Sequence, residues 1–289
     1  LAEGMNGWAG IYEAVEITTY SGPGAVIQYQ RPSSGCLAYL IHDGQTAAVV
    51  DPLRAFTDRY LDDAAELAVD LELAFDTHIH ADHVSGLRSL ANRGVTVYLP
   101  ELAADRGIDY EIDYELVQDG DAISLGQVEI EAIHTPGHTS GMTSYRAGNV
   151  LLTGDGLFTE SFARPDLEEG ADGAPAAAGT LYDTLIDRVF PLPGDLVVAP
   201  GHFSDVATRA PDNTYTARLA DLEAVFTELD LDREGFIEFV LDDMPPRPGN
   251  FEDIIAINLG QQRADDDEAF RLELGPNNCA ATQGAISSD

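Results

Sequence analysis

The chain is predicted to adopt a layered α/β fold, and three features of the sequence support this prediction. Apolar runs of strand length alternate with segments whose apolar residues recur about every 3.6 positions. Hydrophobic residues make up 44% of the 289 positions, which is enough to build a sizeable core. Several apolar runs end in a turn that contains glycine, an arrangement typical of strands that present side chains at the edge of a sheet.

The expected elements follow in chain order. Short runs rich in Val, Ile, Leu, Ala and Tyr predict strands at residues 25–29, 36–41, 46–50, 73–76, 96–99, 128–133, 150–152 and 196–199. Helical spacing predicts helices at residues 57–69, 84–92, 181–190, 214–229 and 233–241. Residues 168–179, rich in Ala, Gly and Asp, are expected to form a mobile surface loop. We expect one catalytic domain over residues 21–265, an arm over 1–20 and an acidic, polar tail over 266–289.

The most informative segment is Thr-His-Ile-His-Ala-Asp-His at residues 77–83, which places three imidazoles and a carboxylate within six residues. Three more candidate ligands, His138, Asp155 and His202, each follow an apolar run and stand beside a glycine. Side chains at strand ends can point into a shared rim, so we expect these groups to form a metal site. Imidazole and carboxylate ligands suit zinc, iron or manganese rather than copper(I). The other two histidines, His42 and His134, are expected to be structural.

This set of ligands resembles that of the metallo-β-lactamase superfamily over residues 25–206. The resemblance implies a four-layer αββα sandwich with the metal site at one edge of the two sheets. It further implies a first site and a second site that share Asp155. The remaining ligands would be His78, His80 and His138 in the first site, and Asp82, His83 and His202 in the second.

Within that superfamily, two segments resemble the signature of the persulfide dioxygenases. They are Gly-Asp-Gly-Leu-Phe at 154–158 and Ala-Arg-Pro-Asp-Leu at 163–167, where Ala163 replaces the glycine of the signature. Residues 180–182 and 245–258 are similar to that subfamily as well. The resemblance implies a single iron(II) held by His78, His138 and Asp155, and oxidation of a low-molecular-weight thiol persulfide by O₂ to sulfite and thiol. The other four ligands would then hydrogen-bond to the first three and orient them.

Three residues are candidates for roles in catalysis: Asp82, Arg164 and Tyr182. The resemblance implies that Arg164 orients the active-site loop or a substrate carboxylate, and the other interpretation is an ion pair with Asp166 or a neighbouring residue. Tyr182 either donates a hydrogen bond to the thiol carrier or packs in the core. The resemblance also implies that Asp51 lies near the metal site as a hydrogen-bond acceptor.

Two alternative functions stay open. The first is a thioesterase of the glyoxalase II type with two zinc ions, since all seven ligand positions are filled. A basic, thiol-binding helical domain of that enzyme type is not evident. The second alternative is a metal-binding scaffold domain that serves a sulfurtransferase. Residues 1–8 resemble the closing segment of a rhodanese domain, and the other interpretation of these residues is an ordinary N-terminal arm.

The charge of the chain limits the classes of partner that it can bind and indicates the compartment in which it works. Its formal net charge is −36, its isoelectric point is near 4.1, and all fifteen basic residues are arginine. Such a surface excludes nucleic acid and anionic membranes as partners. Cys36 and Cys279 form no disulfide framework, which fits a reducing cytosol, and Cys36 is expected to be a small buried hydrophobe. The composition resembles that of halophile cytosolic proteins, so we expect a cytoplasmic protein adapted to high salt. An oligomer is compatible with the sequence.

Salt is expected to stabilise the protein. The Debye length falls from about 10 Å at 0.1 M to about 3 Å at 1 M salt, so repulsion among the acidic side chains should be screened. We predict that the melting temperature rises between about 0.1 and 2 M potassium chloride. A melting temperature that stays constant over this range would contradict the prediction.

Overall fold

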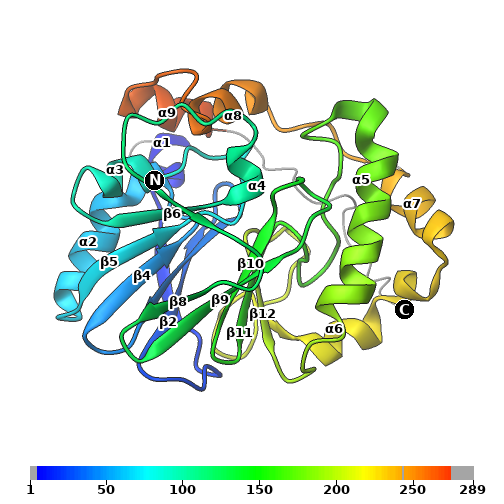
Figure 1. Ribbon diagram of the computed structural model, residues 1–289, viewed down its shortest axis with the longest axis horizontal. Coiled ribbons are helices and arrows are strands. Elements are labelled where there is room, and N and C mark those ends of the chain that lie inside the picture. Colours follow the sequence, from blue (N-terminus) through cyan, green and yellow to red (C-terminus); the bar gives the residue numbers. More distant parts are fainter. Residues whose placement is uncertain (1–4, 243, 275–289) are drawn as a thin grey trace.

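The computed structural model describes residues 5–242 and 244–274 of the chain. Two β-sheets pack face to face at the centre, and helices cover the outer face of each sheet (Figure 1). These four layers confirm the layered α/β fold predicted from the sequence and form the αββα sandwich that the family resemblance implies. Within the described residues, no helix is long and apolar enough to cross a membrane.

The first sheet has seven strands that follow one another in chain order. Its first four strands pair antiparallel, and the pairs from β4 to β7 are parallel. Strands covered on both faces are apolar almost throughout, and β3 is buried at six of its seven positions. The strands are β1 (Glu13–Glu16), β2 (Ala25–Arg31), β3 (Cys36–His42), β4 (Thr46–Val50), β5 (Asp70–Phe75), β6 (Thr96–Pro100) and β7 (Glu115–Val117).

The second sheet has six strands in the order β13-β12-β11-β10-β9-β8. It is antiparallel except for the pair β11 and β12, which is parallel. The strands are β8 (Ala122–Leu125), β9 (Val128–His134), β10 (Thr143–Ala147), β11 (Val150–Gly154), β12 (Val197–Pro200) and β13 (Ala217–Arg218).

Alternation along the strands separates the inner core from the outer cores. On β3, Leu37, Tyr39 and Ile41 belong to the core between the two sheets. Their neighbours Ala38 and Leu40 face the other way, into the core beneath the helices. Successive side chains of a strand point to opposite faces, so one apolar strand serves two layers.

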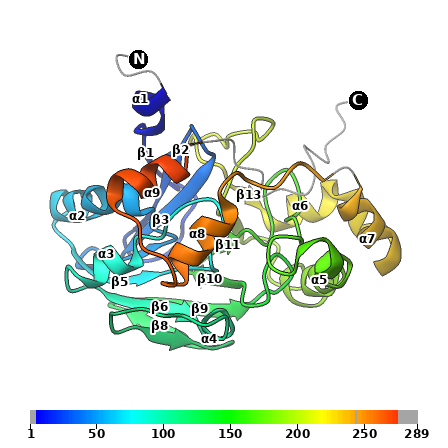
Figure 2. The ribbon, with the colours of Figure 1, turned by 90° about the horizontal axis from the view of Figure 1, so that it is seen from above.

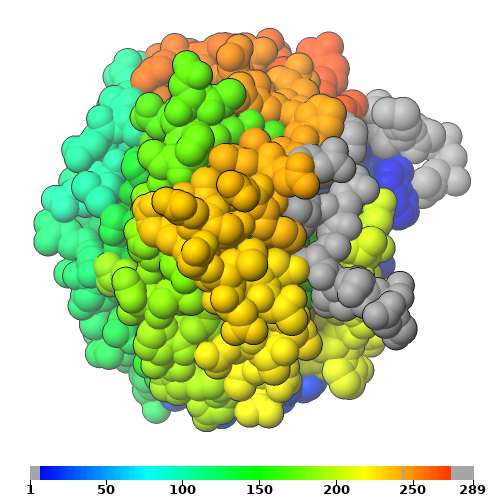
Figure 3. Space-filling view, turned by 90° about the vertical axis from the view of Figure 1, so that its right-hand side faces the viewer, coloured from blue at the N-terminus to red at the C-terminus, as the bar shows by residue number. Residues whose placement is uncertain are grey.

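The helices fall into three groups. The first sheet is covered by α2 (Thr57–Glu66) and α3 (Leu87–Ala91), and the second by α5 (Gly170–Thr184), α6 (Leu219–Val225) and α7 (Arg233–Leu241). Figure 3 shows the face that α5 to α7 form. The C-terminal helices α8 (Phe251–Asn258) and α9 (Asp266–Leu272) lie at the upper edge of the sheets in Figure 1. The short elements are α1 (Met5–Ala9), η1 (Arg54–Phe56), α4 (Glu101–Ala104), the π-helical turn η2 (Leu185–Val189) and η3 (Thr227–Asp230).

Three expectations about local structure were wrong. Residues 170–179 are not a loop but the first part of α5, because this segment contains five alanines, a strong helix former, and buries Ala174 and Ala178. The helix expected at 214–229 is two short ones, α6 and η3. Residues 266–272 form α9 with Ala269 buried, rather than part of a tail. Residues 1–4 and 275–289, including Cys279, lie outside the described residues.

Asp43 fixes the turn between β3 and β4. Its carboxylate accepts backbone N–H groups from Thr46, Gln127 and Gln45 at 2.9, 2.9 and 2.8 Å, and these bonds, that of Thr46 first, lower its pKa to about 2. The folded pKa lies below the unfolded value of about 3.9, so the stabilisation is present above pH ~4 and is lost as the pH falls towards 2.

Asp43→Asn is therefore expected to lower the free energy of unfolding at neutral pH and to flatten its decline between pH ~4 and ~2. Urea denaturation across this pH range measures both effects. Asp62→Asn, which removes the same charge from an exposed position on α2, is the matched control. A slope in Asp43→Asn as steep as that of the control would contradict the prediction.

Candidate metal centre

The seven predicted ligands all lie in loops that follow strands β5, β9, β11 and β12. None of their residues is more than 7% exposed. The structure thus brings together groups that are up to 124 positions apart, the separation between residues 78 and 202. The ligands are His78, His80, Asp82, His83, His138, Asp155 and His202.

A first cluster consists of His78, His138 and Asp155, which each offer a ligand atom within 4.8 Å of the others. Asp155 Oδ2 lies 3.9 Å from His78 Nε2 and 3.7 Å from His138 Nε2. The Nδ1 atoms of both rings are engaged elsewhere: that of His78 lies 2.9 Å from Thr77 Oγ1, and that of His138 donates to the Arg164 carbonyl at 2.8 Å. Fixing Nδ1 in this way orients a histidine and leaves Nε2 for a metal.

The protonation states of this cluster suit a cation. Burial lowers the pKa of His78 well below its usual value, with a further contribution from His80, and burial lowers the pKa of His138 as well. Burial raises the pKa of Asp155, but His202 beside it outweighs this effect, and the net shift is downward. Neutral imidazoles and an ionised carboxylate are the forms that bind a metal.

A second cluster consists of Cys36, Asp82, His83 and His202. Asp82 Oδ2 lies 2.6 Å from His202 Nε2 and 3.2 Å from His83 Nδ1, and it accepts a hydrogen bond from the Cys36 thiol at 3.2 Å. His202 Nδ1 lies 2.5 Å from Asp155 Oδ1, so Asp155 joins the two clusters through its two oxygens. Cys36 is buried as expected, but its place in this cluster was missed, since nothing near it in the sequence marks it as a ligand.

His80 lies in a third group, with Asp51 and Asp76. Its Nε2 is 3.1 Å from Asp51 Oδ1 and 3.8 Å from Asp76 Oδ1. Asp51 also accepts the Thr77 N–H at 2.7 Å, as expected for an acceptor near the site, and it has a left-handed backbone with φ of 53°. Strained backbone of this kind in a residue other than glycine is common at functional sites.

Two glycines allow the ligand loops to approach one another. A Cβ atom at Gly201 would lie 2.7 Å from Asp155 Oδ1, and one at Gly154 would lie 2.5 Å from Thr77 Oγ1. Gly154 also has φ of 49°, a left-handed conformation that costs glycine little. Gly154 and Gly201, which stand beside Asp155 and His202, are thus required by close packing of the loops.

The residues present fit a bound metal ion. Among the described residues, buried polar side-chain atoms without a hydrogen-bond partner include His78 Nε2, His80 Nδ1, His83 Nε2 and Asp155 Oδ2. An unpaired buried polar atom costs about 1–3 kcal/mol, so a gathering of such atoms needs an explanation. A cation bound by His78 Nε2 and Asp155 Oδ2, which belong to the first cluster, would provide it for these two atoms.

Arg164 and Tyr182 have contacts that tie them to the surrounding structure. Arg164 is 1% exposed and donates to Asp166 through Nε and Nη2, at 2.7 and 3.1 Å. The ion pair with Asp166, one of the two interpretations of Arg164, is therefore present. Burial raises the pKa of Asp166, but hydrogen bonds from Arg164 and Arg247 outweigh it, and the pKa is lowered. The Tyr182 hydroxyl donates to the Leu231 carbonyl at 3.1 Å. A role of Tyr182 towards the thiol carrier stays a prediction.

The fold and the buried His/Asp clusters define a metalloenzyme, and a comparison with known families places it. Residues 32–202 match the Metallo-beta-lactamase superfamily, so the chain belongs to that superfamily.

Three relatives narrow the comparison. The mitochondrial persulfide dioxygenase ETHE1 of Homo sapiens is 29% identical over 260 residues, which cover 84% of this chain and 92% of the relative. The crystal structure of ETHE1 from Myxococcus xanthus aligns with a TM-score of 0.69 and 29% identity, over 81% of this chain and 98% of that one. A hydroxyacylglutathione hydrolase of Brucella ovis is 34% identical over 175 residues, 56% of this chain and 60% of the relative.

Proposed function

We propose that the protein is a persulfide dioxygenase, which oxidises a low-molecular-weight thiol persulfide with O₂ at a single iron(II). One persulfide, one O₂ and one water would give one thiol, one sulfite and two protons. The observation that carries the proposal is the grouping of His78, His138 and Asp155 into a cluster of two imidazoles and one carboxylate. This ligand set, with open positions beside it, is typical of non-haem iron(II) oxygenases.

The hydrogen bonds of the second cluster favour a site for one metal. Asp82 is hydrogen-bonded to His83, His202 and Cys36. His80 Nε2 is held by Asp51, which leaves His80 Nδ1 as a further atom that could bind the metal. His202 holds Asp155 Oδ1, which leaves Oδ2 on the side of His78 and His138. When bound, iron(II) would offer open coordination positions and, unlike zinc, could change its oxidation state while electrons pass from the persulfide sulfur to O₂.

The roles of the chain's own residues follow from these contacts. Thr77 and the Arg164 carbonyl hold the two imidazole rings with Nε2 directed at Asp155. His202, which is itself bonded to Asp82, orients the Asp155 carboxylate. Burial of the whole cluster keeps bulk water away, which protects reactive sulfur and oxygen species from side reactions. The likeness to the two ETHE1 proteins over most of their length supports the same assignment.

A second candidate function is a thioesterase with two zinc ions. All seven ligands of the two-metal pattern are buried together, and a hydroxyacylglutathione hydrolase is among the relatives. That relative is matched over 60% of its length, however, and the second cluster is already hydrogen-bonded within itself. We therefore rank it below the dioxygenase.

Oxygen uptake tests the proposal. Enzyme reconstituted anaerobically with one iron(II) per chain, in molar salt, receives a low-molecular-weight persulfide in an oxygen-electrode chamber. Uptake with sulfite formed in proportion is the expected result, and the zinc-loaded enzyme is the control without it. If several persulfides give no uptake and the two-zinc form hydrolyses an acyl-thioester, the second candidate is the correct one.

A further inference from the structure

The C-terminal segment 246–273 lies outside residues 32–202, the part that matches the superfamily, yet it reaches the metal-binding loops. Helices α8 and α9 cross the edge of the sheets from which these loops emerge (Figure 2). Side chains of this segment bond directly to the backbone of residues 80–85, which contain His80, Asp82 and His83.

Asn258, at the end of α8, makes most of these bonds. Its Nδ2 donates to the carbonyls of His80 and His83, at 2.9 and 2.8 Å. Its Oδ1 accepts the N–H of Ser85 at 2.9 Å. The residue is 2% exposed, so these bonds are made away from solvent.

The loop needs such a partner because residues 78–84 belong to neither sheet. Buried backbone N–H and C=O groups must find hydrogen bonds, and a ladder supplies none to this loop. A carboxamide offers two donors and an acceptor on one side chain, a combination that Asp and Leu lack. Asn258 thus provides, on both sides of Asp82, the backbone hydrogen bonds that a neighbouring strand would otherwise provide.

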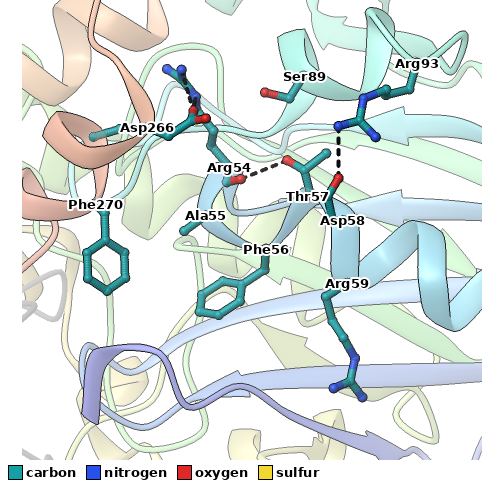
Figure 4. A pocket seen from close by; sticks show the side chains of 11 residues that line it. Arg54, Ala55, Phe56, Thr57, Asp58, Arg59, Ser89, Arg93, Asp266 and Phe270 are labelled. Atoms are coloured by element: carbon teal, nitrogen blue, oxygen red, sulfur yellow. Dashed lines mark hydrogen bonds and ion pairs between the residues drawn. The ribbon is translucent and has the colours of Figure 1, made fainter. Parts of the chain in front are cut away.

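A second C-terminal side chain extends this support. Glu273 Oε1 accepts the N–H of Val84 at 2.8 Å, so residues 83, 84 and 85 are all held from the C-terminal segment. Helix α9, just before Glu273, is itself anchored by the ion pair of Arg54 with Asp266 at 2.7 Å. Figure 4 shows this pair, with Phe270 and Phe56 lining the hollow beside it.

We propose that Asn258 is a positioning residue of the metal site. By holding the carbonyls of His80 and His83 it sets the path of the loop, and with it the direction of the imidazole rings and of Asp82. The C-terminal segment is then part of the metal-binding apparatus, not only a cover of the fold. The proposal concerns metal binding and does not depend on persulfide oxidation.

Metal affinity tests this proposal in three variants. Asn258→Ala removes all three bonds. Asn258→Asp keeps the acceptor for Ser85 and loses both donors. Ile254→Ala is the matched control, because Ile254 is 1% exposed on the same helix and bears no hydrogen-bonding group. The dissociation constants of iron(II) and zinc(II) are measured anaerobically by competition with a chromophoric chelator, next to the melting temperature of each metal-free variant.

Asn258→Ala is expected to raise the dissociation constants about 10- to 100-fold, the usual effect of losing a partner that orients ligands. Asn258→Asp should raise them too, and it decides the matter if the alanine variant does not fold. Ile254→Ala should lower the melting temperature and leave the constants within about twofold of wild type. Wild-type affinity in both Asn258 variants, or an equal loss in Ile254→Ala, would overturn the proposal. The experiment measures metal binding and not enzymatic turnover. Its result therefore stays valid even if the protein is not a dioxygenase.

Discussion

Asp155→Asn is expected to lose iron(II) and, with it, oxygen uptake. Asp155 is 0% exposed and supplies the only carboxylate of the first cluster, while its other oxygen binds His202. Asparagine keeps the shape but removes the negative charge that a buried dication needs. Loss of a ligand should exceed the roughly 10- to 100-fold that loss of an orienting partner costs, so we expect the iron dissociation constant to rise by more than about 100-fold.

Two measurements check this prediction. The metal content per chain after dialysis gives the loss of iron, and the oxygen electrode gives the loss of turnover. Asp119→Asn is the control, since Asp119 pairs with Arg188 on the surface and the substitution removes the same charge. Retention of iron by Asp155→Asn at wild-type affinity would show that Asp155 is not a ligand.

The elements that could be predicted from the sequence are those whose pattern is local. Strand β4 and helix α7 have the predicted bounds because an apolar run or a helical stripe marks each of them from end to end. Strand β13 has two residues and exists only through its pairing with β12, so no local pattern could reveal it. The first part of helix α5, residues 170–179, was missed because its Gly, Asp and Pro175 suggest a loop, whereas packing on the second sheet makes it a helix.

The residues of the candidate site also fall into those that a local sequence pattern reveals and those that it does not. Its seven histidine and aspartate ligands could be predicted, since four stand together in the run 77–83 and three follow an apolar run beside a glycine. Cys36 and Asn258 could not be predicted as parts of the site. Cys36 bonds to Asp82, which is 46 positions away in the chain, and Asn258 bonds to His83, which is 175 positions away. Only the packed fold decides which distant side chain reaches a given loop, and neither composition nor periodicity contains that information.

Arg31→Met is expected to lower the free energy of unfolding by about 3–5 kcal/mol, the usual cost of removing one partner of a buried ion pair. Arg31 Nη1 lies 2.5 Å from Glu273 Oε2, with both side chains at most 1% exposed. The guanidinium also donates to the Ala9 carbonyl and lies over the rings of Phe56 and Phe270, 5.4 and 5.5 Å from their centroids. The substitution would leave the Glu273 carboxylate buried without its cation.

Urea denaturation measures the loss of free energy of unfolding. An exposed ion pair with the same N···O distance serves as the control. Arg263 Nη2 and Glu111 Oε1 are also 2.5 Å apart, but their side chains are 78% and 77% exposed. Arg263→Met should cost at most about 1 kcal/mol, because water screens an exposed pair. Equal losses in the two variants would refute the role of burial. The double variant Arg31→Met with Glu273→Gln should lose less than the sum of the two single losses, since no unpaired charge then remains inside. It should still bind metal, because the glutamine carbonyl can accept the Val84 N–H.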